Sequence, residues 1–188
     1  MHFAKHSELA GFHATLSPST YHWINYSDDK LDQWFANRLE AAKGTALHEF
    51  AHQAIKLGIK LPKTQKTLNL YVNDAIGFKM ISEQILFYSS NCFGTADAIK
   101  FDARKMHLRI HDLKNGVTKA SMHQLEVYEA LFCLEYGFKP ADLTTELRIY
   151  QYDDVEIYEP EIDDITHIMD TIITFDRRIE QMKEAAFQ

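Results

Sequence analysis

The segment from residue 94 to residue 114, GTADAIKFDARKMHLRIHDLK, contains two apolar runs separated by a short polar stretch. The runs Phe93 to Phe101 and Met106 to Leu113 are rich in β-branched and aromatic residues, which is typical of strands. The polar residues between them are those of a turn. We therefore predict two adjacent strands, with Asp97 in the first strand and Asp112 in the second.

Both aspartates lie in apolar surroundings, where a carboxylate is costly unless a cation or a partner compensates its charge. On neighbouring strands, Asp97 and Asp112 can converge on one hard cation such as Mg²⁺ or Mn²⁺. Hydrolysis of a phosphodiester needs such a cation, which polarises the phosphate and activates the attacking water. Lys114 follows Asp112 by two positions, so the strand pleat places both side chains on one face. Its ammonium group would orient the water and offset the charge that develops on the phosphate.

The pattern of the whole chain predicts an α/β fold. Helical spacing of apolar residues runs from Pro18 to about Met80, and strand-like patterns follow. The later elements are a further strand at Gln84 to Ser90, a helix at Lys119 to Tyr136, a strand through Leu147, Ile149 and Tyr152, and a helix from about Ile162 to Ala185. This order predicts a central mixed β-sheet flanked by helices. The length of 188 residues and the lack of a linker predict a single domain over residues 1–188.

Four motifs of the chain, taken in their order, make it resemble a known family, the RecB-like branch of the PD-(D/E)xK nucleases. This branch includes exonucleases that act in recombination and in CRISPR adaptation. The four motifs are the segments Gly44 to Glu49 (GTALHE), Gly94 to Ile99 (GTADAI) and Asp112 to Lys114 (DLK), and the pair Gln124 and Tyr128, which matches the QxxxY signature of that family. The Leu16 to Ser19 segment is similar to the usual N-terminal opening of the family.

The resemblance implies a restriction-endonuclease-like fold and a metal-dependent deoxyribonuclease, with exonuclease activity on DNA. It assigns metal binding to His48, Asp97, Asp112 and the Leu113 carbonyl, and catalysis to Asp97, Asp112 and Lys114. It places Gln124 and Tyr128 beside the DNA strand. Glu83 and Glu49 are further acidic residues within reach of such a centre. Many relatives carry a four-cysteine iron–sulfur cluster, but Cys92 and Cys133 are too few for one, so a cluster-free member that uses Mg²⁺ or Mn²⁺ is expected.

The first of these motifs overlaps a complete HExxH motif, His48 to His52, which suggests a different chemistry. On a helix, His48 and His52 would bind zinc and Glu49 would be the general base of a protease. The longer metzincin pattern fails, because Ile55 stands where its glycine belongs and Gly58 where its histidine belongs, although Glu83 remains a candidate third ligand. A zinc protease therefore stays an alternative, as does a noncatalytic nucleic-acid-binding or structural protein.

The net charge of −7 bears on the choice of partner, because affinity for nucleic acid rests largely on Lys and Arg. Seven acids lie between Asp153 and Asp164, and the rest of the chain is balanced. A lysine run from Lys56 to Lys66 is either a phosphate-docking face or a solvated surface. DNA remains the expected partner, with a homo-oligomer or a recombination or replication protein as the source of a positive channel. Neither a signal peptide nor a membrane span is expected, which favours a cytoplasmic protein, and a small domain of this kind suits a phage or mobile element.

Overall fold

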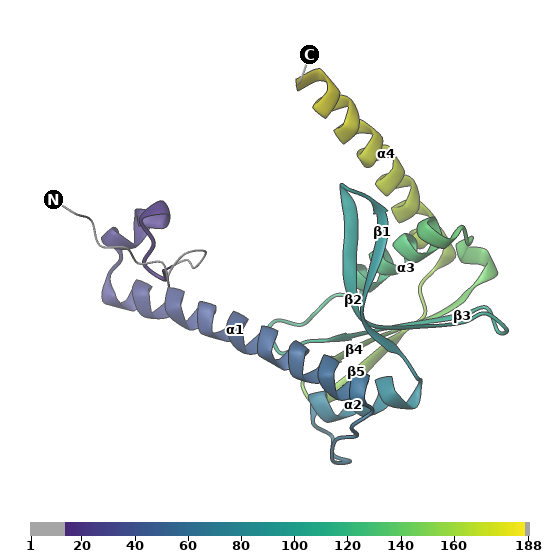
Figure 1. Ribbon diagram of the computed structural model, residues 1–188, viewed down its shortest axis with the longest axis horizontal. Coiled ribbons are helices and arrows are strands. Elements are labelled where there is room, and N and C mark those ends of the chain that lie inside the picture. The colour runs from purple at the N-terminus through teal and green to yellow at the C-terminus, as the bar shows by residue number, and fades with distance from the viewer. Residues whose placement is uncertain (1–13, 187–188) are drawn as a thin grey trace, which may run out of the picture. The chain divides into compact units, whose positions relative to one another are not determined.

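The structure is a computed structural model that describes residues 14–186 (Figure 1). Contacts divide the chain into two compact units, residues 1–43 and 44–188. The prediction of one domain over the whole chain stays a prediction. The helices are η2 (Pro18–Asn25), α1 (Asp28–Leu57), α2 (Thr67–Gly77), α3 (His123–Tyr136), η3 (Pro140–Asp142) and α4 (Ile162–Ala186). The strands are β1 (Ile81–Ser89), β2 (Cys92–Asp102), β3 (His107–Leu113), β4 (Thr144–Gln151) and β5 (Asp154–Tyr158).

The described part of the first unit consists of η2 and the beginning of α1. Ser17 caps η2, because its side chain accepts a hydrogen bond from the backbone of Ser19, and Pro18 occupies the first turn, where a missing N–H costs nothing. The indole of Trp23 donates to the carbonyl of Ser17 at 3.0 Å. These contacts make η2 a tight local structure that begins where the sequence predicts it.

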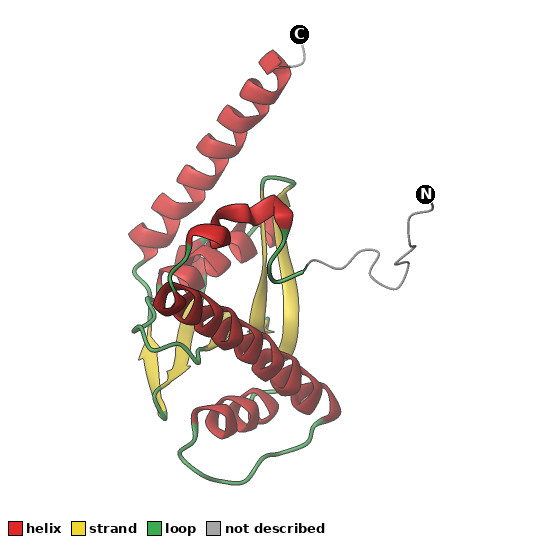
Figure 2. Ribbon diagram, turned by 90° about the vertical axis from the view of Figure 1, so that its left-hand side faces the viewer, coloured by secondary structure: helices red, strands yellow, loops and turns green. Residues whose placement is uncertain are grey.

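The second unit is built on a five-stranded sheet in which the strands follow chain order, β1-β2-β3-β4-β5. The strands are labelled in Figure 1 and drawn in yellow in Figure 2. All neighbouring strands are antiparallel except β3 and β4, which are parallel. A parallel pair needs a long crossover, and α3 lies in the connection between β3 and β4. The predicted mixed sheet flanked by helices is therefore confirmed.

The end of the sheet differs from the sequence-based prediction in two ways. The prediction carried the fourth strand through Tyr152, but β4 ends at Gln151, and Tyr152 and Asp153 form a turn with φ angles of 57° and 58°. A fifth strand, β5, follows and pairs with β4. The sequence-based prediction lacks this strand, which is only five residues long and is separated from β4 by the two turn residues Tyr152 and Asp153.

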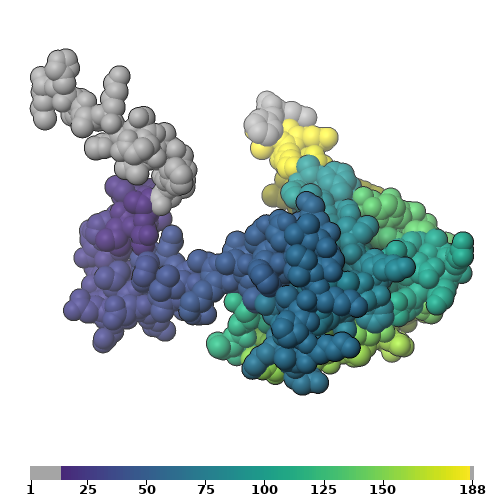
Figure 3. All heavy atoms as spheres, turned by 60° about the horizontal axis from the view of Figure 1, so that its bottom comes forward, coloured from purple at the N-terminus to yellow at the C-terminus, as the bar shows by residue number. Residues whose placement is uncertain are grey.

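Two hydrophobic clusters cover the two faces of the sheet. One cluster joins the last turns of α1 and all of α2 to the sheet through residues such as Ala54, Val72 and Ala98. The other joins α3 to the opposite face through residues such as Leu125 and Ile110. The space-filling view shows the first face, where the blue segment that contains α2 lies over the teal strands (Figure 3).

The connection before α3 is irregular where the sequence predicted a helix. The helix begins at His123 and not at Lys119. The side chain of Gln151 is the physical reason: its amide donates to the carbonyls of Gly116 and Thr118, and its oxygen accepts from the N–H of Ala120. These backbone groups are thus satisfied without a helix.

Of the two thiols, Cys133 is buried and Cys92 is partly buried. Within residues 14–186, no helix combines the length and the apolar character that crossing a membrane requires.

Candidate metal centre

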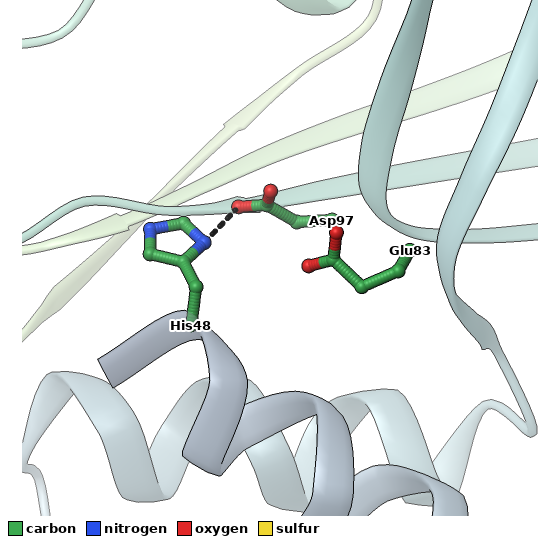
Figure 4. Close-up of side chains that lie close together, drawn as sticks. All are labelled: His48, Glu83 and Asp97. Carbon is green, nitrogen blue, oxygen red and sulfur yellow. Dashed lines mark ion pairs between the residues drawn. The ribbon is translucent and has the colours of Figure 1, made fainter. Parts of the chain in front are cut away.

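Three side chains from three different elements meet beside the sheet: His48 of α1, Glu83 of β1 and Asp97 of β2 (Figure 4). One ligand atom from each residue lies within 4.8 Å of those of the other two. The Nδ1 atom of His48 is 3.3 Å from Oδ2 of Asp97. Among the described residues, this is the group of histidine, cysteine and acidic side chains whose spacing suits a metal ion.

Strand register explains why Glu83 and Asp97 meet. Ser82 pairs with Ala98 and Gln84 with Ala96, so Glu83 and Asp97 fall between two regular pairs of the same ladder. Glu83 has a φ of 55°, which is unusual for a residue with a side chain and carries a cost of order 1 kcal/mol or more. Local strain of this kind is often found where a strand re-aims a functional side chain.

Strand β2 also changes its orientation at the same place. Ala96 belongs to the cluster under α3, whereas Ala98 belongs to the cluster under α1 and α2. Regular alternation would put both alanines on one face of the sheet. The twist therefore falls at Asp97, which lies between them, and it lets the carboxylate reach both His48 and the next strand.

The third predicted acid, Asp112, lies on the neighbouring strand. Ala98 pairs with His111 in this antiparallel ladder, and Asp97 precedes Ala98 on β2 whereas Asp112 follows His111 on β3, so the two aspartates lie at the same end of the pair. The carboxylate of Asp97 accepts a hydrogen bond of 2.9 Å from the backbone N–H of Leu113. This bond joins the end of β3 to the Asp97 carboxylate. It holds Asp112 close to the group formed by His48, Glu83 and Asp97, although Asp112 is not part of that group.

Lys114 forms an ion pair with Asp112. Its Nζ donates to Oδ1 at 3.1 Å and lies 3.0 Å from Oδ2. The second contact does not have hydrogen-bond geometry, so Oδ2 is buried without a hydrogen-bond partner among the described residues. The spacing of two positions between the aspartate and the lysine thus brings their charged groups together, as the sequence predicts.

Gln124 and Tyr128 of α3 form a chain of hydrogen bonds from Lys114 to β2. Lys114 donates to Oε1 of Gln124 at 2.9 Å, Nε2 of Gln124 donates to the Tyr128 hydroxyl at 3.3 Å, and that hydroxyl donates to the carbonyl of Thr95 at 2.6 Å. A Cβ on Gly94 would lie 3.0 Å from the Tyr128 ring, so the glycine gives this ring its room. The Gln–Tyr pair of the sequence thus fixes the position of the Lys114 ammonium group.

The other two defining residues of the HExxH motif on α1, Glu49 and His52, make contacts outside the candidate metal centre. Glu49 is exposed and accepts a hydrogen bond from Gln53 at 2.8 Å. His52 shares a 2.8 Å hydrogen bond with the hydroxyl of Ser82. Among the described residues, His48 is grouped with Glu83 and Asp97 and not with His52.

The electrostatics of the centre show an excess of negative charge. Burial, followed by repulsion from Asp97, raises the pKa of Asp112 to about 6 despite its contact with Lys114. The same two effects, in the same order, raise the pKa of Glu83. The hydrogen bond to Asp97 raises the pKa of His48, against the opposing effect of burial. Each group thus shifts in the direction that would reduce the local negative charge.

One residue near the centre has no signal in the sequence. Tyr71 of α2 is 2% exposed, and burial raises its pKa well above the ordinary value, with further contributions from Asp97, Asp112 and Glu83. It is part of the hydrophobic cluster beneath these carboxylates. At helical spacing within an apolar segment, a tyrosine is indistinguishable from a core residue, so only the fold reveals its position.

The donors of this centre fit a hard divalent cation. Carboxylate oxygens suit Mg²⁺ or Mn²⁺, and the imidazole nitrogen, a ligand of transition metals, favours Mn²⁺ of the two. The buried Oδ2 of Asp112, which has no hydrogen-bond partner among the described residues, is a further potential ligand. A cation would also offset the repulsion that raises the pKa of Asp112 and Glu83. No family model, curated protein or solved structure matches this chain.

Proposed function

We propose that this chain is a metal-dependent deoxyribonuclease with a restriction-endonuclease-like fold, using Mg²⁺ or Mn²⁺. The observation that supports the proposal best is the grouping of His48, Glu83 and Asp97 next to the Asp112–Lys114 pair. It combines ligands for a hard cation with a fixed ammonium group, and hydrolysis of a phosphodiester requires both.

The residues of the chain would divide the work as follows. His48, Glu83 and Asp97 would hold the cation, with Asp112 as a further ligand. When bound, the cation supplies positive charge to the phosphate oxygens and lowers the pKa of water. Lys114 would donate a hydrogen bond to the phosphate or to the attacking water, because its side chain remains 30% exposed while it is paired with Asp112.

Gln124 and Tyr128 would act through Lys114. Their hydrogen bonds fix the ammonium group relative to β2 and to α3. The Lys114 side chain would thus already be ordered when the phosphate binds, and binding would cost less side-chain entropy. This role differs from direct contact with the DNA strand, although the exposed side of Gln124 leaves that contact open as well.

The test uses the purified full chain with Mn²⁺ and two DNA substrates, one linear and one circular, with EDTA as the control. Asp97→Asn and Lys114→Ala should each lower the cleavage rate by roughly 100-fold or more, which is the usual cost of removing such a group. Lys105→Ala is the matched control, since Lys105 is exposed at the far end of the β2–β3 pair. Cleavage of linear but not circular DNA would identify an exonuclease.

Two outcomes would contradict the proposal. The first is a folded chain that binds Mn²⁺ and cleaves neither single- nor double-stranded DNA. The second is zinc-dependent cleavage of casein that His52→Ala abolishes, which would identify the HExxH motif as the functional one. Under the proposal, His52→Ala changes only the contact with Ser82 and leaves the nuclease rate within a few-fold of the wild-type value.

A further inference from the structure

A cavity of about 540 Å³ is lined in part by Lys114, the residue that follows the end of β3. Four segments of the second unit surround it: the part of α1 at Leu47, the loop after β3, the start of α2 and the turn between β4 and β5. Its lining residues include Lys114, Asn115, Val117, Lys66, Thr67 and Tyr152. A cavity of several hundred Å³ with an apolar wall and a few polar groups is the usual form of a small-ligand site.

Two of the lining side chains have no partner in the structure. Tyr152 is 58% exposed, and no hydrogen bond, ion pair or ring contact engages its side chain within residues 14–186. The same holds in that range for the side-chain amide of Asn115, which lies next to Gly44, where an added Cβ would come within 3.2 Å of it. An aromatic ring and an amide are thus both available at the wall of the cavity.

The turn that carries Tyr152 is held in an unfavourable conformation. Tyr152 and Asp153 both have φ angles near 57°, in a two-residue hairpin turn where Asn and Gly are preferred. Asp153 explains how the turn persists: its Oδ1 accepts from the backbone N–H of Thr67 at 2.9 Å, and its Oδ2 lies 2.6 Å from Nζ of Lys66. It thereby satisfies the start of α2, and Tyr152 is fixed beside the cavity as a result.

The charges at this place suit one end of a ligand more than the other. Both lysines of the cavity are ion-paired, Lys66 with Asp153 and Lys114 with Asp112, but of the two only Lys114 also belongs to the candidate metal centre. An anionic group would therefore be bound at the Lys114 end. The rest of the cavity, with Tyr152, Val117 and Leu47, suits an uncharged, flat group.

We infer that this cavity binds one nucleotide of the substrate strand, with its phosphate at Lys114, its base stacked on Tyr152 and the base edge in contact with the Asn115 amide. The inference rests on the proposed function, because it places the phosphate in the candidate metal centre. It adds a substrate preference: the nucleotide must be unpaired to stack on the ring, so the cavity selects single-stranded DNA or a frayed end.

The experiment measures binding of a deoxynucleoside monophosphate, dAMP, to the full chain with Mn²⁺ by isothermal titration calorimetry. The variant is Tyr152→Asn, which removes the ring and suits the positive φ at this position. Stacking on an aromatic side chain contributes enough that its loss should raise the Kd about tenfold. Tyr152→Phe keeps the ring and should bind within about twofold of the wild-type chain.

The control is Tyr136→Ala, because Tyr136 is 51% exposed and lines a different cavity. It should leave the Kd for dAMP unchanged. Deoxyribose 5-phosphate, which lacks the base, should bind at least tenfold more weakly than dAMP to the wild-type chain. With a single-stranded oligonucleotide substrate, Tyr152→Asn should raise KM more than it lowers kcat, whereas a merely structural effect would also lower the melting temperature.

Three results would overturn the inference: no measurable binding of dAMP to the wild-type chain, an unchanged Kd in Tyr152→Asn, or equal affinities for dAMP and deoxyribose 5-phosphate. If DNA is cleaved but Tyr152→Asn binds dAMP normally, the nuclease proposal stands and the nucleotide cavity does not. If dAMP binding depends on Tyr152 but no DNA is cleaved, the cavity stands and the nuclease proposal fails.

Discussion

Glu146 and Asp112 are carboxylates on neighbouring strands, yet the charge that surrounds them differs: the groups around Glu146 are positive, whereas Asp112 has another acid beside it. Glu146 of β4 accepts hydrogen bonds from Arg109 at 2.9 Å and from Arg148 at 3.0 Å. Both guanidinium groups also lie against the ring of Phe78, at 4.4 and 4.9 Å from its centre. Although burial opposes it, hydrogen bonding to the two arginines lowers the pKa of Glu146.

Asp112 of β3 has one lysine as its partner and one acid, Asp97, nearby, and its pKa is raised to about 6, first by burial and then by Asp97. The fold thus compensates one carboxylate with its own cations and leaves the other group short of positive charge. This difference separates a structural ion-pair network from a site that would gain from an added cation. Perturbed acids are common in proteins, so the sign of the surrounding charge carries more information than burial alone.

The largest expected effect on stability comes from breaking the compensated network. Glu146→Gln would leave two arginines without their shared carboxylate and should lower the free energy of unfolding by about 3 kcal/mol. Denaturation by urea, followed by circular dichroism, measures the change. Without added metal, Asp112→Asn should instead raise the free energy of unfolding at pH 8, because it removes a buried charge that the fold does not fully compensate. Equal losses in the two variants would show that the two sites do not differ in the proposed way.

The second prediction adds the missing charge to the candidate metal centre. Mn²⁺ at 100 times its Kd should stabilise the wild-type chain by about 2.7 kcal/mol, since a ligand that binds only the folded state stabilises it by mass action. The melting temperature should rise accordingly. Asp97→Asn should abolish the rise, and Asp163→Asn, an exposed acid at the start of α4, should leave it intact. A rise of the same size in Asp97→Asn would place the ion elsewhere.

Glu129 of α3 allows a test of whether a raised pKa by itself marks a metal site. It is 2% exposed, and burial raises its pKa to about 7, but its neighbours are Thr145, which donates to it at 2.7 Å, and one acid, Glu126. Its folded pKa is higher than its unfolded pKa, so its contribution to stability is complete below about pH 4.5 and is lost as the pH rises through about 7.

We therefore expect the wild-type chain to lose about 2 kcal/mol of stability between pH 5 and pH 8 through this group, and Glu129→Gln to lose less. Urea denaturation at both pH values measures the difference. Mn²⁺ should not restore the loss, because within residues 14–186 Glu129 belongs to no group of side chains with the spacing of metal ligands. Restoration by Mn²⁺ in the Asp97→Asn background would contradict the distinction between this acid and the metal centre.

The smallest effect is expected at Gly94. A Cβ there would lie 3.0 Å from the Tyr128 ring, which the hydrogen bond to Thr95 holds in place. Gly94→Ala should displace the ring and loosen Gln124 and Lys114, at a cost of about 1 kcal/mol in stability. In the nuclease assay the rate should fall severalfold, and Gly77→Ala, where a Cβ meets nothing within 4 Å, should leave it unchanged. Equal rates in both variants would show that the Tyr128 ring does not position Lys114.

Much of the candidate site is predictable from local pattern. The strands around Asp97 and Asp112 follow from their β-branched and aromatic residues, and the two-residue spacing of Asp112 and Lys114 brings these side chains together, as a pleat requires. The Gln124–Tyr128 pair was singled out by the resemblance to the QxxxY signature, and the two side chains meet because residues four apart lie on one helix face. His48 was predicted beside Asp97 from the resemblance to a nuclease family, and the 3.3 Å contact agrees with that placement.

Tertiary structure decided what local pattern does not encode. Glu83 joins His48 and Asp97 because strand register puts it there and because its backbone adopts a φ of 55°. Register, and the twist that sends Ala96 and Ala98 to different faces, depend on packing against helices that are distant in the sequence. The sequence by itself determined which residues carry charge and on which elements Asp97, Asp112, Gln124 and Tyr128 lie. Only the packed sheet determined which of those charges are compensated, because compensation depends on distances across strands and helices.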